Sequence, residues 1–479
     1  MNSTDRASSV DGERFELSAT PQAGYRVGDY LAIDGRSGPS VVGQILDIDL
    51  RSTEPPRFHA TGELLDKVSP FVGAAVRPAD ADEIEAAILS DEPGLRIGHS
   101  FSGTARPPAH LRATGFGRHT FMCGQSGSGK TYSMGVILES LLAETSLRMI
   151  IVDPNSDYIH LGAIDERRRG DRDEGFAARL AAAGQQVFVA GSGHDIDLRV
   201  RFGRLTIDQQ ATVLRLDPLR DSTEFSVFLS IVGELATTEY GLAEIVEAAR
   251  RRSDPAGDRL ALRIQNLRLV DAPIWAVPGE ATTLDQVPDG WRALVVDLGS
   301  LASARDRTVI AASLTTSLWE VRRNREPVLL VIDEAHNVCP NDPRDADQAM
   351  AIDAVTSIAA EGRKFGQFLM VATQRPDKVH EDIVSQCDNL VLMRMNSASD
   401  IERLVDLFSH VPAGLIRRSS TFALGEGLAA GRIAGRPLLF QTGARLTPEG
   451  GSDLPTTWTL PTDQPRGPFM WPAQLQPRQ

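Results

Sequence analysis

The sequence predicts an α/β fold, in which a mostly parallel sheet with crossover helices follows a small N-terminal β-barrel and is interrupted by an α-helical insertion. Three observations support this fold class. From about residue 118, short apolar segments alternate with helical ones. From about 13 to 100, short β-prone runs are separated by glycine and proline. Between about 200 and 275 the alternation stops and helical periodicity takes over.

The individual elements follow from local patterns. Residues 1–12 are polar, which predicts a disordered N-terminus. Prolines recur through the last 30 residues and exclude a helix or a central strand there. We therefore predict an extended C-terminal arm at 446–479. The barrel strands are expected at 27–34, 41–50 and 57–65, with turns at 34–35 and 37–39. Strands of the sheet are expected at 120–123, 147–152, 293–296, 328–332, 368–373 and 390–395, and a helical stretch at 225–252.

Composition excludes several classes of protein. A formal net charge of −14 argues against a chain that coats nucleic acid with its whole surface, although a local basic channel remains compatible. Three cysteines without CxxC spacing exclude a disulfide scaffold and a cysteine-rich zinc site, and they fit a reducing cytoplasm. We find neither a signal peptide nor an apolar run of about 18 residues, so no membrane segment is predicted.

Residues 124–131 match the phosphate-loop pattern G-x-x-x-x-G-K-[ST] at every position, between an apolar strand and an amphipathic helix. Glycines let backbone N–H groups curl around phosphate oxygens, and the helix N-terminus adds its positive end. We expect Lys130 to reach the β- and γ-phosphates and Thr131 to bind Mg²⁺. The sequence therefore predicts an ATP and Mg²⁺ site formed by Gly124, Ser126, Gly127, Ser128, Gly129, Lys130 and Thr131.

Three apolar strands end in an aspartate, namely Asp153, Asp297 and Asp333. Only Asp333 is followed by a glutamate, and this pair predicts hydrolysis: Asp333 holds Mg²⁺ through water, and Glu334 polarises the attacking water as general base. Asp153 opens an acidic loop beside the phosphate loop and is a candidate nucleotide contact. Capping of the following loop is the alternative for Asp153 and for Asp297. Gln374, at the tip of the next strand, is expected to sense the γ-phosphate or to orient the water.

Residues 333–336 spell DEAH, which suggests a superfamily-2 helicase. Asp333 lies too far from Lys130 in the sequence for one compact lobe without an insertion, and too few residues follow it to form a second lobe. The sequence contains neither the Q-x-x-G-R-x-x-R motif of those helicases nor the LSGGQ-like signature of ABC ATPases. Both classes are therefore disfavoured.

Four strings resemble the HerA/FtsK P-loop superfamily, and specifically the HerA-like DNA translocases. They are residues 118–120, 151–158, 332–337 and 361–376, of which the last (EGRKFG followed by ATQRP) is the most specific. The N-terminal region is similar to the small barrel that these proteins share with ATP synthase subunits. The resemblance implies a HAS-barrel-like domain at 13–100 and a RecA-like ATPase domain at 101–445 that contains the insertion.

The resemblance also implies a homohexamer with ATP between subunits and double-stranded DNA in the central pore. In such rings a neighbour's arginine reaches the γ-phosphate. Arg363 is the first candidate, followed by Arg375 and Arg394, and a surface ion pair is the alternative for each. The implied partner is a NurA-like nuclease or an anti-phage defence effector, in the cytoplasm and away from membranes.

Two other functions stay open. One is an ATP-gated scaffold that moves no DNA, and the other is a conjugative or secretion ATPase, which usually has a membrane anchor. No continuous basic stretch marks a DNA-binding loop, so DNA binding rests on the resemblance. The arginines at 167–169 and 250–252 are explained by a solvated mixed-charge loop and by a helix dipole, respectively.

Overall fold

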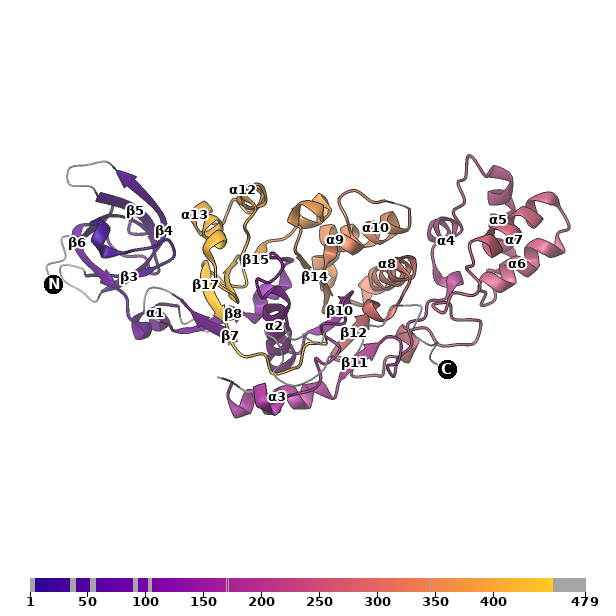
Figure 1. Cartoon of the computed structure of the whole chain (residues 1–479), viewed down its shortest axis with the longest axis horizontal. Helices are drawn as coiled ribbons and strands as arrows, with labels where there is room; N and C mark the ends of the chain where they lie inside the picture. The colour runs from indigo at the N-terminus through magenta and orange to yellow at the C-terminus, as the bar shows by residue number, and fades with distance from the viewer. Residues whose placement is uncertain are drawn as a thin grey trace, which may run out of the picture.

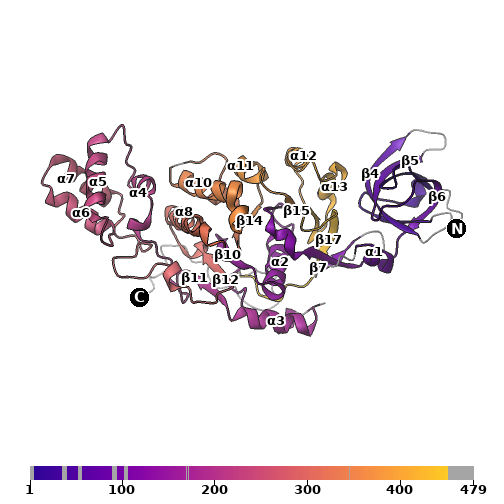
Figure 2. The same cartoon turned by 180° about the vertical axis from the view of Figure 1, so that it is seen from behind.

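The computed structural model describes residues 5–34, 40–51, 57–88, 94–101, 106–168, 170, 172–344 and 346–450. It contains a six-stranded barrel, an eleven-stranded central sheet covered by helices, and a helical insertion. Figure 1 shows the barrel (indigo) and the insertion (rose) at opposite ends of the long axis, with the sheet between them, and Figure 2 shows the same order from behind. The predicted fold class is confirmed.

The barrel closes in the order β1-β2-β5-β4-β3-β6, and every neighbouring pair is antiparallel. Alternate side chains such as Phe15, Leu17 and Ile33 fill its interior. Its strands are β1 (Arg6–Ser9), β2 (Arg14–Ala19), β3 (Tyr30–Asp34), β4 (Val41–Arg51), β5 (Arg57–Leu64) and β6 (Phe71–Pro78).

Two predicted boundaries of the barrel are wrong. Residues 5–12, which we expected to be disordered, contain β1, which pairs with both β2 and β6 and buries Ala7. The barrel ends at β6 rather than at residue 100, because β7 (Gly94–Ser100) pairs with β17 (Leu438–Thr442) and so belongs to the central sheet. Helix α1 (Ala81–Ile88) connects the two parts. The turns predicted at 34–35 and 37–39 fall mainly outside the described residues.

The central sheet has the order β11-β12-β10-β13-β14-β9-β15-β16-β17-β7-β8. The strands from β11 to β15 in this order are parallel, and those from β16 to β8 are antiparallel. All six strands predicted for the sheet are present. The remaining bounds are β8 (Pro108–Arg112), β9 (Thr120–Cys123), β10 (Arg148–Asp153), β11 (Val187–Ala190), β12 (Ala293–Asp297), β13 (Val328–Ile332), β14 (Gln367–Thr373), β15 (Asn389–Met393) and β16 (Glu426–Ala430).

Helices cover both faces of the parallel strands. On β13, Leu330 and Ile332 share one core with α8 and α10, whereas Leu329 and Val331 share another with α2 and α3. Successive strand residues point to opposite faces, so an uninterrupted apolar run fits a strand buried on both sides. The helices of the two faces are α2 (Lys130–Glu144), α3 (Glu174–Gly184), α8 (Ala304–Glu320) and α10 (Ala346–Glu361).

The insertion lies within the predicted range, and an isolated bridge between Val200 and Trp275 joins its two ends. The predicted helical stretch 225–252 is two helices rather than one, since the helix breaks at 236–241. Gln209 donates to Thr316 of α8 at 2.7 Å, which ties the insertion to the ATPase core. Its helices are α4 (Ile207–Val213), α5 (Ser222–Leu235), α6 (Leu242–Arg251) and α7 (Pro255–Asn266).

The remaining short helices are α9 (Ala335–Val338), α11 (Glu381–Val384), α12 (Ala398–Leu407) and α13 (Ala413–Arg417). After β17, residues 443–450 form a strap across α2 (Figure 1), so the arm predicted to begin at 446 starts as part of the ATPase domain. Residues 451–479 lie outside the described part. Within the described ranges, no helix is both long and apolar enough to cross a membrane.

Candidate active site

The phosphate loop connects β9 to α2, as the sequence predicts. Gly127 and Gly129 have φ angles of +72° and +90°, which glycine adopts without steric cost. A Cβ on Gly124 would lie 2.5 Å from the Cβ of Met393, so the loop can approach β15 only with glycine at this position. The first N–H groups of α2 have no acceptor within the helix and are available to a phosphate.

A cavity of about 570 Å³ opens on this loop, a size that suits a small-molecule ligand. One side consists of Gln374 and residues of the phosphate loop and the start of α2, namely Gln125, Ser126, Gly127, Gly129, Lys130, Thr131 and Tyr132. Sequence reasoning missed the opposite side, because no motif marks it. Its residues are Leu424, Gly425, Gln441, Thr442 and Glu449. The two sides meet where the amide of Gly425 donates to the carbonyl of Ser128 at 3.0 Å.

Lys130 is the first residue of α2, and its side chain is buried. Its Nζ lies 2.5 Å from Oδ1 of Asp333 and 3.1 Å from Oε1 of Glu334. Burial alone would lower the pKa of Lys130, but these two carboxylates raise it above the usual value for lysine. The three charged groups that the sequence assigns to the phosphates, to Mg²⁺ and to the attacking water therefore meet at the carboxyl ends of β9 and β13.

Glu334 has a left-handed backbone with φ of +44°, which is strained for a residue with a side chain. Its Oε1 accepts from Nε2 of Gln374 at 2.8 Å, and its Oε2 lies 3.3 Å from Nδ1 of His336. His336 Nδ1 also lies 3.1 Å from Oγ1 of Thr373. Burial lowers the pKa of His336, so the ring is neutral near pH 7. Gln374 therefore lies beside the predicted base, where it can orient water.

Asp333 and Glu334 do not line the cavity themselves but contact Lys130, which does. Asp153 does not line the cavity either. Its two carboxylate oxygens accept the backbone N–H groups of Asn155 at 3.2 Å and Tyr158 at 2.8 Å. It therefore caps its own loop, which was the alternative to the predicted nucleotide contact. Asp297 is also a cap, since its Oδ1 accepts the amide of Ser300 at 3.2 Å. Burial raises the pKa of Asp153 to about 7.

Arg363 lies at the opposite edge of the sheet from the phosphate loop. It precedes β14, and its Nη1 donates to Oδ2 of Asp388, just before β15, at 2.7 Å. Because β14 has seven residues, the two edges are roughly 20 Å apart. The guanidinium of Arg118 lies 3.5 Å from the same carboxylate oxygen. The side chain of Arg363 is 31% exposed, so it is accessible from outside the chain.

The other two candidate arginines lie at the edge that carries the phosphate loop. Nη2 of Arg394 donates to the carbonyl of Gly127 at 3.1 Å, so this residue supports the loop of its own chain. Arg375 follows Gln374 and is exposed, and its charge contributes to lowering the pKa of His336, although burial is the larger cause. Of the three candidates, only Arg363 lies too far from the phosphate loop of its own chain to reach it.

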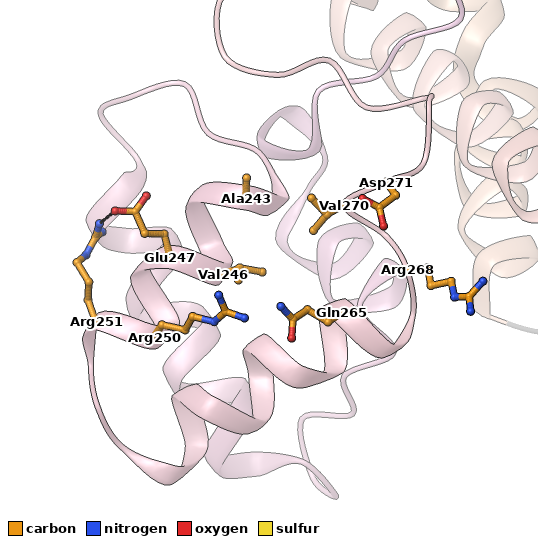
Figure 3. A pocket seen from close by; sticks show the side chains of 9 residues that line it. All are labelled: Ala243, Val246, Glu247, Arg250, Arg251, Gln265, Arg268, Val270 and Asp271. Carbon is orange, nitrogen blue, oxygen red and sulfur yellow. Dashed lines mark hydrogen bonds and ion pairs between the residues drawn. The ribbon is translucent and has the colours of Figure 1, made fainter.

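A larger groove, of about 660 Å³, lies in the insertion and contains no residue of the phosphate site. In Figure 3, Arg250 and Gln265 point toward each other across it, whereas Arg251 forms an ion pair with Glu247 at 2.7 Å. Arg252 pairs with Glu234. Two of the three arginines at the end of α6 are therefore in ion pairs, which fits the prediction that they do not form a DNA-binding cluster.

The residues of the site fit Mg²⁺ and ATP. Oγ of Ser128 is buried and has no hydrogen-bond partner within the described ranges, but Ser128 does not line the cavity, unlike the other predicted loop residues from Ser126 to Thr131. Thr131 and Asp333 offer the hydroxyl and carboxylate oxygens that Mg²⁺ prefers. Bound Mg²⁺ would neutralise charge on the phosphates. Lys130 would stabilise the transferred phosphoryl group, Gln374 would orient the attacking water, and Glu334 would take its proton.

Comparison with known proteins shows the family of the chain. The family model described as "Helicase HerA, central domain" matches residues 95–270. The DNA double-strand break repair helicase HerA of Pyrococcus furiosus is 32% identical, in an alignment that covers 89% of each chain. The chain belongs to the HerA family. HerA of Saccharolobus solfataricus is 22% identical over 78% of this chain and 73% of its own. The alignment with HerA of Sulfurisphaera tokodaii is 28% identical but covers only 30% of each chain.

Among solved structures, VirB4 of Thermoanaerobacter pseudethanolicus is similar, with a TM-score of 0.51 over 74% of this chain and 98% of VirB4. At 17% identity, this likeness shows a shared RecA-like P-loop fold only. Together with the family, the phosphate loop and the Asp333–Glu334 pair identify the chain as an ATP-hydrolysing enzyme.

Proposed function

We propose that this HerA-family ATPase forms a homohexameric ring and drives double-stranded DNA through a central pore. The two relatives whose alignments cover more than 70% of each chain are named as DNA double-strand break repair helicases, which supports DNA as the substrate. A NurA-like nuclease or an anti-phage defence effector, acting with the ring in the cytoplasm, belongs to the same proposal.

The observation that carries the proposal is the position of Arg363. It lies roughly 20 Å from its own phosphate loop, at the other edge of the sheet, and so it can act only on a nucleotide bound to another subunit. Arg118 adds a second guanidinium on the same carboxylate, so Asp388 cannot neutralise both. A phosphate of the neighbouring subunit's nucleotide would complete this charge balance. Head-to-tail contacts of this kind form a ring when the rotation between neighbouring subunits closes.

A mixing experiment tests the arrangement. Lys130→Ala and Arg363→Ala each remove one half of a shared site, so each variant alone should hydrolyse almost no ATP. Mixed in equal amounts, they should restore activity, because about a quarter of the interfaces combine an intact Lys130 with an intact Arg363. The matched control mixes Lys130→Ala with the double variant Lys130→Ala/Arg363→Ala. It should stay inactive, because neither chain supplies an intact Lys130. If the mixture hydrolyses ATP no faster than the two variants do separately, Arg363 does not act on the nucleotide of a neighbouring subunit.

Duplex DNA separates the translocase from the ATP-gated scaffold. A translocase should hydrolyse ATP faster when duplex DNA is added, and the effect should weaken as salt rises. If duplex DNA leaves the rate of ATP hydrolysis unchanged, the result would support the ATP-gated scaffold instead.

A further inference from the structure

We propose that Tyr158 is a positioning residue for the Mg²⁺ side of the ATP site, and that Arg445 of the C-terminal strap sets its place. The inference rests on the ATPase activity and on the roles assigned to Asp333 and Thr131. It does not depend on the ring or on DNA.

The hydroxyl of Tyr158 lies between the two residues assigned to Mg²⁺. It is 3.3 Å from Oδ2 of Asp333 and 3.4 Å from the backbone carbonyl of Thr131, and the side chain is fully buried. The other carboxylate oxygen of Asp333, Oδ1, already accepts from Lys130 at 2.5 Å and from the amide of Glu334 at 2.8 Å. The tyrosine therefore donates to the remaining oxygen and fixes the plane of the carboxylate.

The backbone of Tyr158 is held by Asp153, whose Oδ2 accepts its N–H at 2.8 Å. This contact gives the buried Asp153 a role that differs from the predicted nucleotide contact. On the other side, the guanidinium of Arg445 lies 5.5 Å from the centre of the tyrosine ring, and its Nη2 donates to the carbonyl of Asp157 at 3.1 Å. Tyr158 is thus fixed at its backbone and at its ring, and only its hydroxyl faces the site.

Arg445 is itself fixed by α2, the helix that begins at the phosphate loop. Its side chain is fully buried, and it packs where Gly135 leaves room, since a Cβ there would lie 2.4 Å from its Nε. Its backbone N–H donates to the hydroxyl of Tyr132 at 2.8 Å. The next two residues are held by the buried carboxylate of Glu139, which accepts the amides of Leu446 at 3.1 Å and Thr447 at 2.6 Å.

These contacts form a continuous path from the strap to the Asp333 carboxylate. Groups that orient a metal ligand are worth roughly 10–100-fold in metal affinity when they are removed. If Tyr158 served only in packing, removing its hydroxyl would leave the affinity for Mg²⁺ unchanged. The Tyr158 hydroxyl is therefore the atom to test.

Tyr158→Phe removes that hydroxyl and keeps the ring that packs against Arg445. We expect the Mg²⁺ concentration needed for half-maximal binding of a fluorescent ATP analogue to rise about 10-fold. Binding of the same analogue in EDTA should stay unchanged. Tyr240→Phe is the matched control, because it loses a buried hydroxyl that donates to Gln210 in the insertion, away from the site. It should keep the wild-type Mg²⁺ dependence.

Arg445→Gln provides a second test. It should raise the Mg²⁺ requirement in the same direction, and adding Tyr158→Phe to it should cause little further change, because both act through one hydroxyl. An unchanged Mg²⁺ dependence in a folded Tyr158→Phe variant would overturn the inference. If the wild-type protein binds the fluorescent ATP analogue equally well with and without Mg²⁺, both this inference and the role of Asp333 are wrong. A failed subunit-mixing experiment would leave these binding measurements unaffected.

Discussion

Replacing Glu334 with glutamine separates the chemical step from nucleotide binding. The two side chains have the same shape, and the contacts of Glu334 allow the exchange. Oε1 can still accept from Lys130 at 3.1 Å and from Gln374 at 2.8 Å. The new amide group would face Nδ1 of His336, which can accept a hydrogen bond when the ring proton is on Nε2. The substitution therefore removes charge and basicity with little disturbance of the fold.

The expected effect follows from the role of a general base. Such a group is worth about 10²–10⁴-fold in rate, or about 3–5 kcal/mol of activation free energy. Lys130 keeps Asp333 as a partner at 2.5 Å, so it stays charged and can still bind a phosphate. ATP hydrolysis should therefore fall at least about 10²-fold. Affinity for ATP should be kept or increased, because one negative charge near the phosphates is removed.

The assay measures phosphate release at saturating ATP together with equilibrium binding of a fluorescent ATP analogue. Glu326→Gln is a matched control. Glu326 pairs with Arg148 at 2.5 Å, is 63% exposed and lies at the other edge of the sheet, so both quantities should stay at their wild-type values. Hydrolysis at the wild-type rate by Glu334→Gln would refute the general-base role. A loss of ATP binding would show instead that Glu334 mainly supports the structure.

Two further substitutions test the packing behind the site by thermal unfolding. Gly135→Ala should lower Tm by about 1–2 °C, because a clash with the buried Arg445 costs up to about 3 kcal/mol, against a helix-propensity gain of about 1 kcal/mol. A higher Tm would contradict the observed packing. Burial raises the pKa of Asp153 from 3.8 to about 7, so its stabilising contribution is full below about pH 4 and is lost as the pH rises toward 7. Asp153→Asn removes the titrating group, so between about pH 5 and pH 8 the Tm of the nucleotide-free variant should fall less than the Tm of the wild-type protein. An equal fall in both proteins would contradict a raised pKa of Asp153.

The parts of the site that the sequence could predict are those encoded by short, contiguous strings. The phosphate loop needs glycine and lysine at fixed spacing, and Asp333–Glu334 must follow a strand, so each motif contains its own structural context. Parallel strands buried on both faces also leave continuous apolar runs, which explains why all six predicted strands are present. Asp153 shows the limit of this reasoning. Its position at a strand end suits both a ligand and a cap, and only the contacts with Asn155 and Tyr158 decide.

The parts that the sequence could not predict depend on partners far away in the chain. Residues Arg6–Ser9, of which only Ala7 is apolar, become a strand because β2 and β6 offer their edges. Glu139 is a buried acid on an apolar helix, which marks it as unusual, but nothing local shows that Leu446 and Thr447 will donate to it. An unpaired buried carboxylate is costly, so this helix and the strap stabilise each other. The end of the ATPase domain thus supports the helix that follows its phosphate loop, and through Arg445 and Tyr158 the strap reaches the residue assigned to Mg²⁺.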